Sequence, residues 1–493
     1  MDTEEKTQPL SEEQLLEKRE KKQYDKMTKT PIPRLVVGLG IPTMLSMMIT
    51  SLYNLADTYF VSIIGDDAIT AAVGNLLALM SIIQAIGFTY GMGSGALVST
   101  LLGKRDRDGA DKVASSAFFI GMFSGLLIMT FGLLFLTPLV RLFGSLDSET
   151  IGYARQYAIY ILIAAPFMCM SFVLNNVLRA EGKAILSMIG LIVGAVVNVG
   201  LDPLLIFGFD LGISGAAIAT CVSQILSFCI LLFMFLSHKT IVRIRVNAIS
   251  RKFAVYGDII ATGFPSFCRQ ILASLCAVFL TRAAFKYGTL AYGTEKGGQA
   301  AQAAFNVVQK VFMLAFSISL GIGQGYQPVL GYNYSAKRFD RVKSAYLFTL
   351  GFSTLLMLGF CIVCGIFSKG LMGLFSLSGM ATEIGSFALR LQCITMPLLP
   401  MNFMIGLTYQ VVGNKALASL LSISRQGLFY IPAVLIMPAV FKLTGVQACQ
   451  AVSDFFAFFF AIPFTLHFFK VLRDNEKKCQ EERLSEGQVS VES

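Results

Sequence analysis

The stretch Ser46-Met-Met-Ile-Thr-Ser-Leu-Tyr-Asn-Leu-Ala-Asp57-Thr-Tyr-Phe-Val61 places a carboxylate inside an apolar run that extends from about Leu35 to Ile64. A bilayer core is crossed by about 20 helical residues that rise about 1.5 Å each, so this run can span a membrane. An ionised aspartate at the centre of such a helix costs roughly 2.5–3.5 kcal/mol. Asp57 is therefore a candidate functional residue, and the rest of the chain must supply its partner.

The composition indicates a polytopic membrane protein. Of the 493 residues, 55% are hydrophobic and 14% are charged, which is more apolar surface than a soluble domain buries. The net charge of +10 does not indicate a nucleic-acid partner, because Lys and Arg fall in short clusters between apolar runs. We expect membrane lipids around the protein and no bound nucleic acid.

Apolar runs of membrane-spanning length occur twelve times along the chain. They begin near residues 35, 71, 113, 151, 184, 213, 253, 299, 342, 383, 415 and 445. The basic clusters occupy every second loop, including residues 104–112, 238–252 and 337–343. This alternation predicts an all-α polytopic protein with twelve transmembrane helices and both termini in the cytoplasm.

An internal repeat divides these spans into two halves. Gly91-Met-Gly-Ser-Gly95, followed by a basic loop, recurs as Gly321-Ile-Gly-Gln-Gly325, about 230 residues later. The offset covers an even number of spans, so two six-helix lobes are expected to be related by a pseudo-two-fold axis along the membrane normal. The predicted segments are a disordered cytoplasmic N-terminus at 1–31, an N-lobe at 32–237, a basic linker at 238–252, a C-lobe at 253–472 and a cytoplasmic tail at 473–493.

Candidate partners for Asp57 come from spans five and six. Asn198 and Asp202 lie four residues apart and therefore share a helical face, and the next span brings the Thr220 hydroxyl to a similar height. Carboxylate, amide and hydroxyl oxygens are hard donors that suit a small cation, and two nearby carboxylates can also share a proton. The alternative is that these side chains only join helices by satisfying one another.

Four fragments of the chain also resemble a known family. Tyr-Asn-Leu-Ala-Asp57-Thr, Asn-Asn-Val-Leu-Arg-Ala-Glu-Gly182, Asn198-Val-Gly-Leu-Asp-Pro203 and the run from Gly215 to Thr220 are similar, in this order, to the multidrug and toxic compound extrusion family. The likeness is to its bacterial branch with an N-lobe cation site and covers about residues 32–472. It implies a transporter of the bacterial cytoplasmic membrane.

The resemblance also implies roles for individual residues. Asp57, Asn198, Asp202 and Thr220 would form the cation site, which would be a metal site if the ion is Na⁺, with Tyr157 close to it. Tyr53 and Asn175 would line the N-lobe cavity. Pro42 matches the proline at which span one bends in the family.

The C-lobe has a different set of charges. A related branch uses acidic residues in spans seven and ten, but here these spans offer only Asp258 and Glu383, both near span ends. Asp454 lies well inside span twelve, and several cations lie in or near the C-lobe runs: Arg269, Arg282, Lys310, Arg390 and Arg425. Asp454 either pairs with one of these cations or meets a cationic substrate.

These features together predict a monomeric antiporter. A small amphipathic, drug-like and cationic compound would leave by alternating access as Na⁺ or H⁺ enters. No Walker motif is present, so ATP is not the expected energy source, and no other cofactor is implied. A flippase for a lipid-linked precursor is the alternative transporter. No clustered nucleophile or metal set indicates an enzyme.

Overall fold

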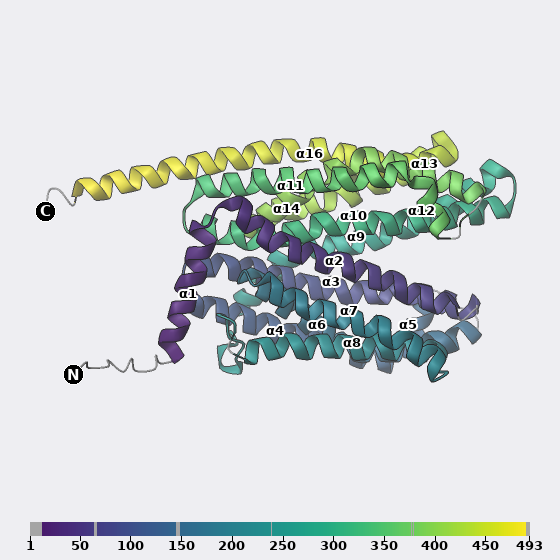
Figure 1. The fold of residues 1–493 in the computed structure, drawn as a ribbon, viewed down its shortest axis with the longest axis horizontal. Coiled ribbons are helices and arrows are strands. Elements are labelled where there is room, and N and C mark those ends of the chain that lie inside the picture. The colour runs from purple at the N-terminus through teal and green to yellow at the C-terminus, as the bar shows by residue number, and fades with distance from the viewer. Residues whose placement is uncertain are drawn as a thin grey trace, which may run out of the picture.

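The computed structural model of the chain is an elongated bundle whose long helices run along one common direction, with the first helix, Glu12–Lys29, lying across one end (Figure 1). It describes residues 12–63, 67–143, 148–237, 239–375, 377 and 379–489. In this part of the chain, eleven helical runs are long and apolar enough to cross a membrane. The last run, Lys415–Glu482, breaks at Lys442, whose φ is 51° and whose ψ is −130°. The break divides this run into two, which gives the twelve spans that the sequence predicts.

The N-lobe contains the first six spans. Their bounds are α2 (Ile32–Ile63), α3 (Asp67–Gly103), α4 (Arg107–Leu134), α6 (Ser148–Ala180), α7 (Ala184–Pro203) with the π-helix η1 (Leu204–Gly208), and α8 (Gly212–Leu236). Span three begins earlier than predicted because Asp106 caps the helix, its Oδ1 accepting a hydrogen bond from the Gly109 amide at 2.9 Å. A capped end lets polar residues form the first helical turn.

The C-lobe repeats this arrangement. Its spans are α9 (Phe253–Tyr292), α10 (Glu295–Ser335), α11 (Phe339–Ile366), α13 (Met380–Thr395) continued by η3 (Met396–Leu398) and α14 (Leu399–Val412), α15 (Lys415–Ile423) continued by the π-helix η4 (Ser424–Tyr430), and α16 (Ile431–Val489) on both sides of its break. The short helix α5 (Leu136–Leu142) follows span three, and α12 (Ser368–Leu374) follows span nine. These matching insertions agree with the predicted duplication.

The hydrophobic core differs between the two ends of the bundle. We call the end that carries the basic loops 104–106, 181–183, 239–252 and 336–338 the basic end, and the opposite one the far end. At the basic end, one cluster of buried side chains contains residues of both lobes, such as Val98 and Val329. At the far end, separate clusters lie around Ile161 in the N-lobe and Leu389 in the C-lobe. The lobes are therefore joined at the basic end.

Glycines allow the two lobes to touch through their backbones near the basic end. A Cβ atom added at Gly263 of α9 would lie 1.8 Å from the Thr89 carbonyl oxygen of α3, and one added at Gly93 would lie 2.2 Å from the Ile259 carbonyl oxygen. A similar contact joins Gly325 of α10 to Gly40 of α2. Only a residue without a side chain permits this approach.

The substitution Gly263→Ala is expected to open the basic end. Overpacking costs about 1–3 kcal/mol, so the closed arrangement should lose roughly five- to hundredfold in population. Spin labels at the exposed residues Lys104 and Asn414, in a background without other cysteines, should report a longer inter-lobe distance. Gly257→Ala is the control, because an added Cβ atom meets nothing within 4 Å there. Equal distance distributions for the two variants would contradict the interpretation.

The prediction of disorder in residues 1–31 is wrong for Glu12–Lys29, which form helix α1. This helix is polar along most of its length, but Met27 and Leu16 are buried. Its backbone and side chains contact both lobes. Gln23 Nε2 donates to the Glu181 carbonyl oxygen at 2.7 Å, and the Met27 carbonyl oxygen accepts from Asn333 Nδ2 at 3.1 Å. These tertiary contacts supply the stability that a short polar helix lacks in isolation.

Met27→Ala is expected to release α1 from the bundle. The Met27 side chain is fully buried, and loss of such a side chain costs about 2–5 kcal/mol. Trypsin should then cleave the basic residues of α1 at least about thirtyfold faster, since cleavage follows the local opening equilibrium. Leu15→Ala serves as the control, because Leu15 is 41% exposed. An unchanged cleavage rate in Met27→Ala would contradict this prediction.

The segment between the lobes is held against the N-lobe. The fully buried Glu181 carboxylate accepts hydrogen bonds from the amides of Ile241 and Val242 at 3.0 and 2.9 Å, and from Lys183 Nζ at 2.7 Å. Arg243 donates its amide to Asp111 Oδ1 at 2.8 Å. Residue 238, where the predicted linker begins, lies outside the described residues. The rest of the linker therefore moves with the N-lobe.

Candidate cation site of the N-lobe

Small residues bring α7 and α8 close together. An added Cβ atom at Gly194 would meet Ser227 Cβ at 3.0 Å, and Ser227 Oγ donates to the Gly190 carbonyl oxygen at 2.9 Å. Close approach of this kind is typical of helix pairs in membranes, where small residues form the interface. Farther along the same interface, Asn198 of α7 lies opposite Thr220 of α8.

Asn198, Asp202 and Thr220 form one buried polar cluster. Their exposed fractions are 1%, 0% and 4%. Asn198 Nδ2 lies 3.5 Å from Asp202 Oδ1 and 3.4 Å from Thr220 Oγ1. These are long distances for hydrogen bonds, whose usual range ends near 3.2 Å. The structure thus brings together three of the predicted site residues, and the contacts between them are loose.

The donor set fits a small hard cation. Asn198 Oδ1 is buried and has no hydrogen-bond partner among the described residues. A half-turn of the amide would exchange this oxygen with Nδ2, and it would then face Asp202 and Thr220. The Thr220 hydroxyl can donate its own proton, but the Asp202 carboxylate and the amide oxygen can only accept, so a cation or a further proton would compensate their repulsion. The cluster could therefore hold Na⁺, or the Asp202 carboxylate could hold a proton.

Asp57 belongs to α2, and its side chain lies outside the described residues. The helix itself packs against α7, which carries Asn198 and Asp202. Within the described part of the chain, no three or more His, Cys, Asp or Glu side chains lie together in a way that could hold a metal ion. Asp57 as the second carboxylate of the cation site therefore stays a prediction.

The other predicted N-lobe residues take separate positions. Tyr157 is fully buried in α6, and its hydroxyl donates toward Met80 Sδ of α3 at 3.9 Å. Asn175 is also buried and donates to the Ser187 carbonyl oxygen at 3.1 Å, so it ties α6 to α7. Tyr53 is half-buried on α2. Their roles at the site and in the cavity stay predictions.

Pro42 lies inside α2 without ending the helix. A proline lacks the amide that would pair with the carbonyl of Gly38, so the helix is weakened at this turn. Ser46 Oγ donates to the Pro42 carbonyl oxygen at 2.8 Å, a side-chain bond that often accompanies helix bending. Both features favour a bend here, and the predicted hinge awaits a test.

The C-lobe confirms one of the two readings of Asp454. Asp454 Oδ1 accepts from Arg425 Nε at 2.8 Å, in an ion pair whose carboxylate side chain is fully buried. Gln450 Nε2 also donates to this oxygen, at 3.1 Å. Gln450 is not among the residues predicted from the sequence, although its position four residues before Asp454 places both on one helical face. Contact of Asp454 with a cationic substrate stays a prediction.

The two acidic residues of spans seven and ten lie away from the lobe interior. Asp258 pairs with Lys415 Nζ at 2.6 Å, and the Asp258 side chain is 59% exposed. Glu383 lies in the first turn of α13 at the far end. Both residues therefore lie near the ends of their spans, as the sequence predicts.

Comparisons with known proteins agree on one family. The family model MatE matches residues 42–204 and 288–436. Multidrug export protein MepA of Staphylococcus aureus (strain MRSA252) is 26% identical over 422 residues, which cover 85% of this chain and 90% of that protein. An outward-facing multidrug resistance MATE family transporter of the MOP superfamily is similar at a TM-score of 0.85 and 25% identity, covering 91% of this chain and 98% of the other. A second solved structure, of a MATE in the straight conformation, has a TM-score of 0.84 and 25% identity, and it covers 91% of this chain and 98% of the other.

Proposed function

Because the chain belongs to the MatE family of membrane transporters, we propose that it exports amphipathic, cationic drug-like compounds in exchange for Na⁺ or H⁺. The observation that carries this proposal is the buried oxygen cluster of Asn198, Asp202 and Thr220, in which Asn198 Oδ1 has no hydrogen-bond partner among the described residues. A cation that enters this cluster gains oxygen ligands that the membrane interior does not otherwise offer.

The proposed location is the bacterial cytoplasmic membrane, with the basic end in the cytoplasm. Basic loops are retained on the cytoplasmic side during insertion. The shared core at the basic end and the separate cores at the far end then correspond to a transporter closed toward the cytoplasm. Alternating access requires the backbone contacts at Gly263 and Gly325 to separate.

Entry of one cation supplies enough free energy for export. A membrane potential of 100 mV contributes about 2.3 kcal/mol per charge, and a tenfold ion gradient about 1.4 kcal/mol. One Na⁺ or H⁺ can therefore hold a neutral substrate at a gradient of roughly several hundredfold. A monovalent cationic substrate, whose one-for-one exchange moves no net charge, reaches about the tenfold gradient of the ion itself. In this mechanism, cation binding neutralises the N-lobe carboxylates, bends α2 at Pro42 and reduces the N-lobe cavity, so that the substrate leaves.

The relatives do not favour the flippase alternative. A pyrophosphate group requires several cations that are not already paired, because its charges must be compensated inside the membrane. The buried Arg425 of the C-lobe is paired with Asp454. Export of small organic compounds agrees better with the multidrug transporters that the chain resembles.

The test uses the purified protein in lipid vesicles loaded with a cationic dye. A Na⁺ gradient and a pH gradient are imposed separately, each without the other. We expect one of them to drive dye movement against its concentration gradient, at a rate far above that of protein-free vesicles. Dye movement that responds to neither gradient would contradict the antiporter.

A further inference from the structure

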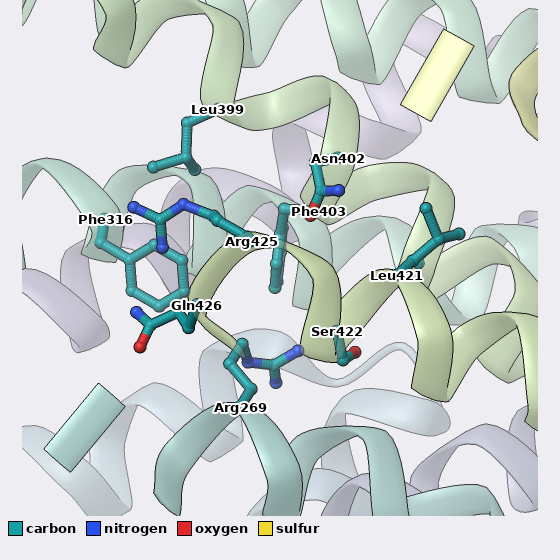
Figure 2. Close-up of a pocket in the computed structure, with 10 residues that line it drawn as sticks. Arg269, Phe316, Leu399, Asn402, Phe403, Leu421, Ser422, Arg425 and Gln426 are labelled. Atoms are coloured by element: carbon teal, nitrogen blue, oxygen red, sulfur yellow. The ribbon is translucent and has the colours of Figure 1, made fainter. Parts of the chain in front are cut away.

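A small cavity inside the C-lobe is lined by two arginines. Its volume is about 20 Å³, and its walls come from α9, α10, α14, α15 and η4. Figure 2 shows Arg425 and Gln426 on the chain turn of η4, and Arg269 on a separate helix, α9. A space of this size holds about one water molecule or one small ion. The cavity is distinct from the N-lobe cluster.

Among the described residues, the two guanidinium groups of this cavity share a single paired carboxylate, that of Asp454. Asp454 pairs with Arg425 at 2.8 Å. Arg269 donates from Nη2 to Ser266 Oγ at 3.2 Å, and its guanidinium carbon lies 5.2 Å from the centre of the Phe403 ring. Within the described part of the chain, no carboxylate lies within 4.0 Å of Arg269. The cavity therefore carries a net charge of about one positive unit, two arginines against one aspartate.

A neutral hydroxyl and an aromatic face compensate a guanidinium only in part. A cation at an aromatic ring gains about 0.5–2 kcal/mol, whereas the effective penalty for burying one ion is several kcal/mol. Arg425 adds a second donor, because its Nη2 is buried without a hydrogen-bond partner in the described structure and the residue is only 7% exposed. A negatively charged group would satisfy both arginines.

The backbone of η4 forms one wall of this cavity. η4 is a π-helix from Ser424 to Tyr430, and insertions of this kind in an α-helix frequently accompany functional sites. Here the wide turn presents two consecutive side chains, Arg425 and Gln426, to one cavity. The N-lobe π-helix, η1, instead lies at the end of its span.

We propose that the cavity between Arg269 and Arg425 binds one monovalent anionic group, of the size of a halide ion or the tip of a carboxylate. The group is either a free inorganic anion or a carboxylate of the exported compound, and the second case rests on the proposed export function. Antiport then involves opposite charges in the two lobes, with a cation in the N-lobe and an anion in the C-lobe.

Binding is tested first, and independently of transport. Thermal unfolding of the full-length protein in detergent is followed at constant Na⁺ while chloride or acetate replaces the bulky morpholinoethanesulfonate anion. We expect both small anions to raise the unfolding midpoint of the wild type. Arg269→Gln should weaken the apparent affinity at least tenfold, and Arg269→Lys should change it only a few-fold.

Arg390→Gln is the matched control for this measurement. Arg390 is also a C-lobe arginine that donates to a serine, Ser368 Oγ at 2.9 Å, but it is exposed and does not line the cavity. It should respond to the anions as the wild type does. The site is wrong if the wild type shows no anion response, or if Arg269→Gln responds equally.

Transport then separates the two sources of the anion. Export by the vesicles is compared for two dyes: a zwitterionic rhodamine that has a free carboxylate, and the methyl ester of the same dye. If the substrate supplies the anion, Arg269→Gln should slow the acid at least tenfold relative to the ester, without dependence on chloride. If an inorganic anion is bound, both dyes should require chloride and slow equally in Arg269→Gln.

Either of these two patterns supports the anion site. The site is overturned if Arg269→Gln keeps both the wild-type ratio of acid to ester export rates and the wild-type dependence on chloride. If wild-type vesicles export neither dye while the anion response of unfolding persists, the export function fails and the anion site stands.

Discussion

Vesicles that contain Asp202→Asn are expected to lose cation-driven export completely. The substitution keeps the size and hydrogen-bonding shape of the side chain but removes the charge that attracts Na⁺ or H⁺. Exchange of one monovalent cation for a monovalent cationic dye moves no net charge, so the driving force is the ion gradient alone, about 1.4 kcal/mol per tenfold. Without the coupling ion, this free energy no longer reaches the dye. Under an imposed hundredfold ion gradient, the steady-state dye gradient should fall from roughly a hundredfold to about one.

Asp210→Asn is the control for this substitution. Asp210 is exposed, eight positions along the chain from Asp202, and has a φ of 55° that asparagine tolerates. Its export should match that of the wild type. Dye binding in the absence of any gradient shows whether Asp202→Asn is folded. A folded Asp202→Asn protein that still builds the wild-type gradient would remove Asp202 from the coupling site.

Arg425→Met is expected to cause the largest loss of stability in the C-lobe. The Arg425–Asp454 pair is buried, and removing one partner leaves a charge without compensation inside the lobe. Such losses cost about 3–5 kcal/mol, whereas replacing both charges by apolar residues is often nearly neutral. The double variant Arg425→Met with Asp454→Leu should therefore recover most of the free energy of unfolding.

Unfolding in a denaturing detergent measures both variants. The control is Asp258→Asn, which breaks an ion pair whose carboxylate is 59% exposed, and exposed pairs contribute little. If Arg425→Met loses no more stability than Asp258→Asn, the buried pair is not a principal contact of the lobe. If the double variant is as unstable as the single one, packing rather than charge explains the loss.

The transmembrane part of the fold could be predicted from the sequence because membranes impose simple constraints. The lengths of the apolar runs and the positions of the basic loops predict the spans. The motif that begins at Gly91 and recurs at Gly321 predicts the two lobes. Helix α1 could not be predicted in this way. Its sequence is polar, and its order depends on contacts with Glu181 and Asn333, which are distant in sequence.

The two candidate sites differ in how much the sequence could predict. Asn198 and Asp202 share a helical face. Their proximity to Thr220 could therefore be predicted, because the next span runs back beside them. The sequence could not predict which of several cations pairs with Asp454, because helix rotation and the wide turn of η4 decide which arginine reaches it. Helix periodicity assumes a regular α-helix, and a π-helix changes that register.

The most direct measurement of coupling imposes a dye gradient across vesicles that have no ion gradient and no membrane potential. An antiporter must then move its cation in the opposite direction to the dye. We expect wild-type vesicles to move either Na⁺ or H⁺ against the dye flux, and Asp202→Asn vesicles to move neither. Dye flux through the wild type without any counter-movement of Na⁺ or H⁺ would contradict cation-coupled export.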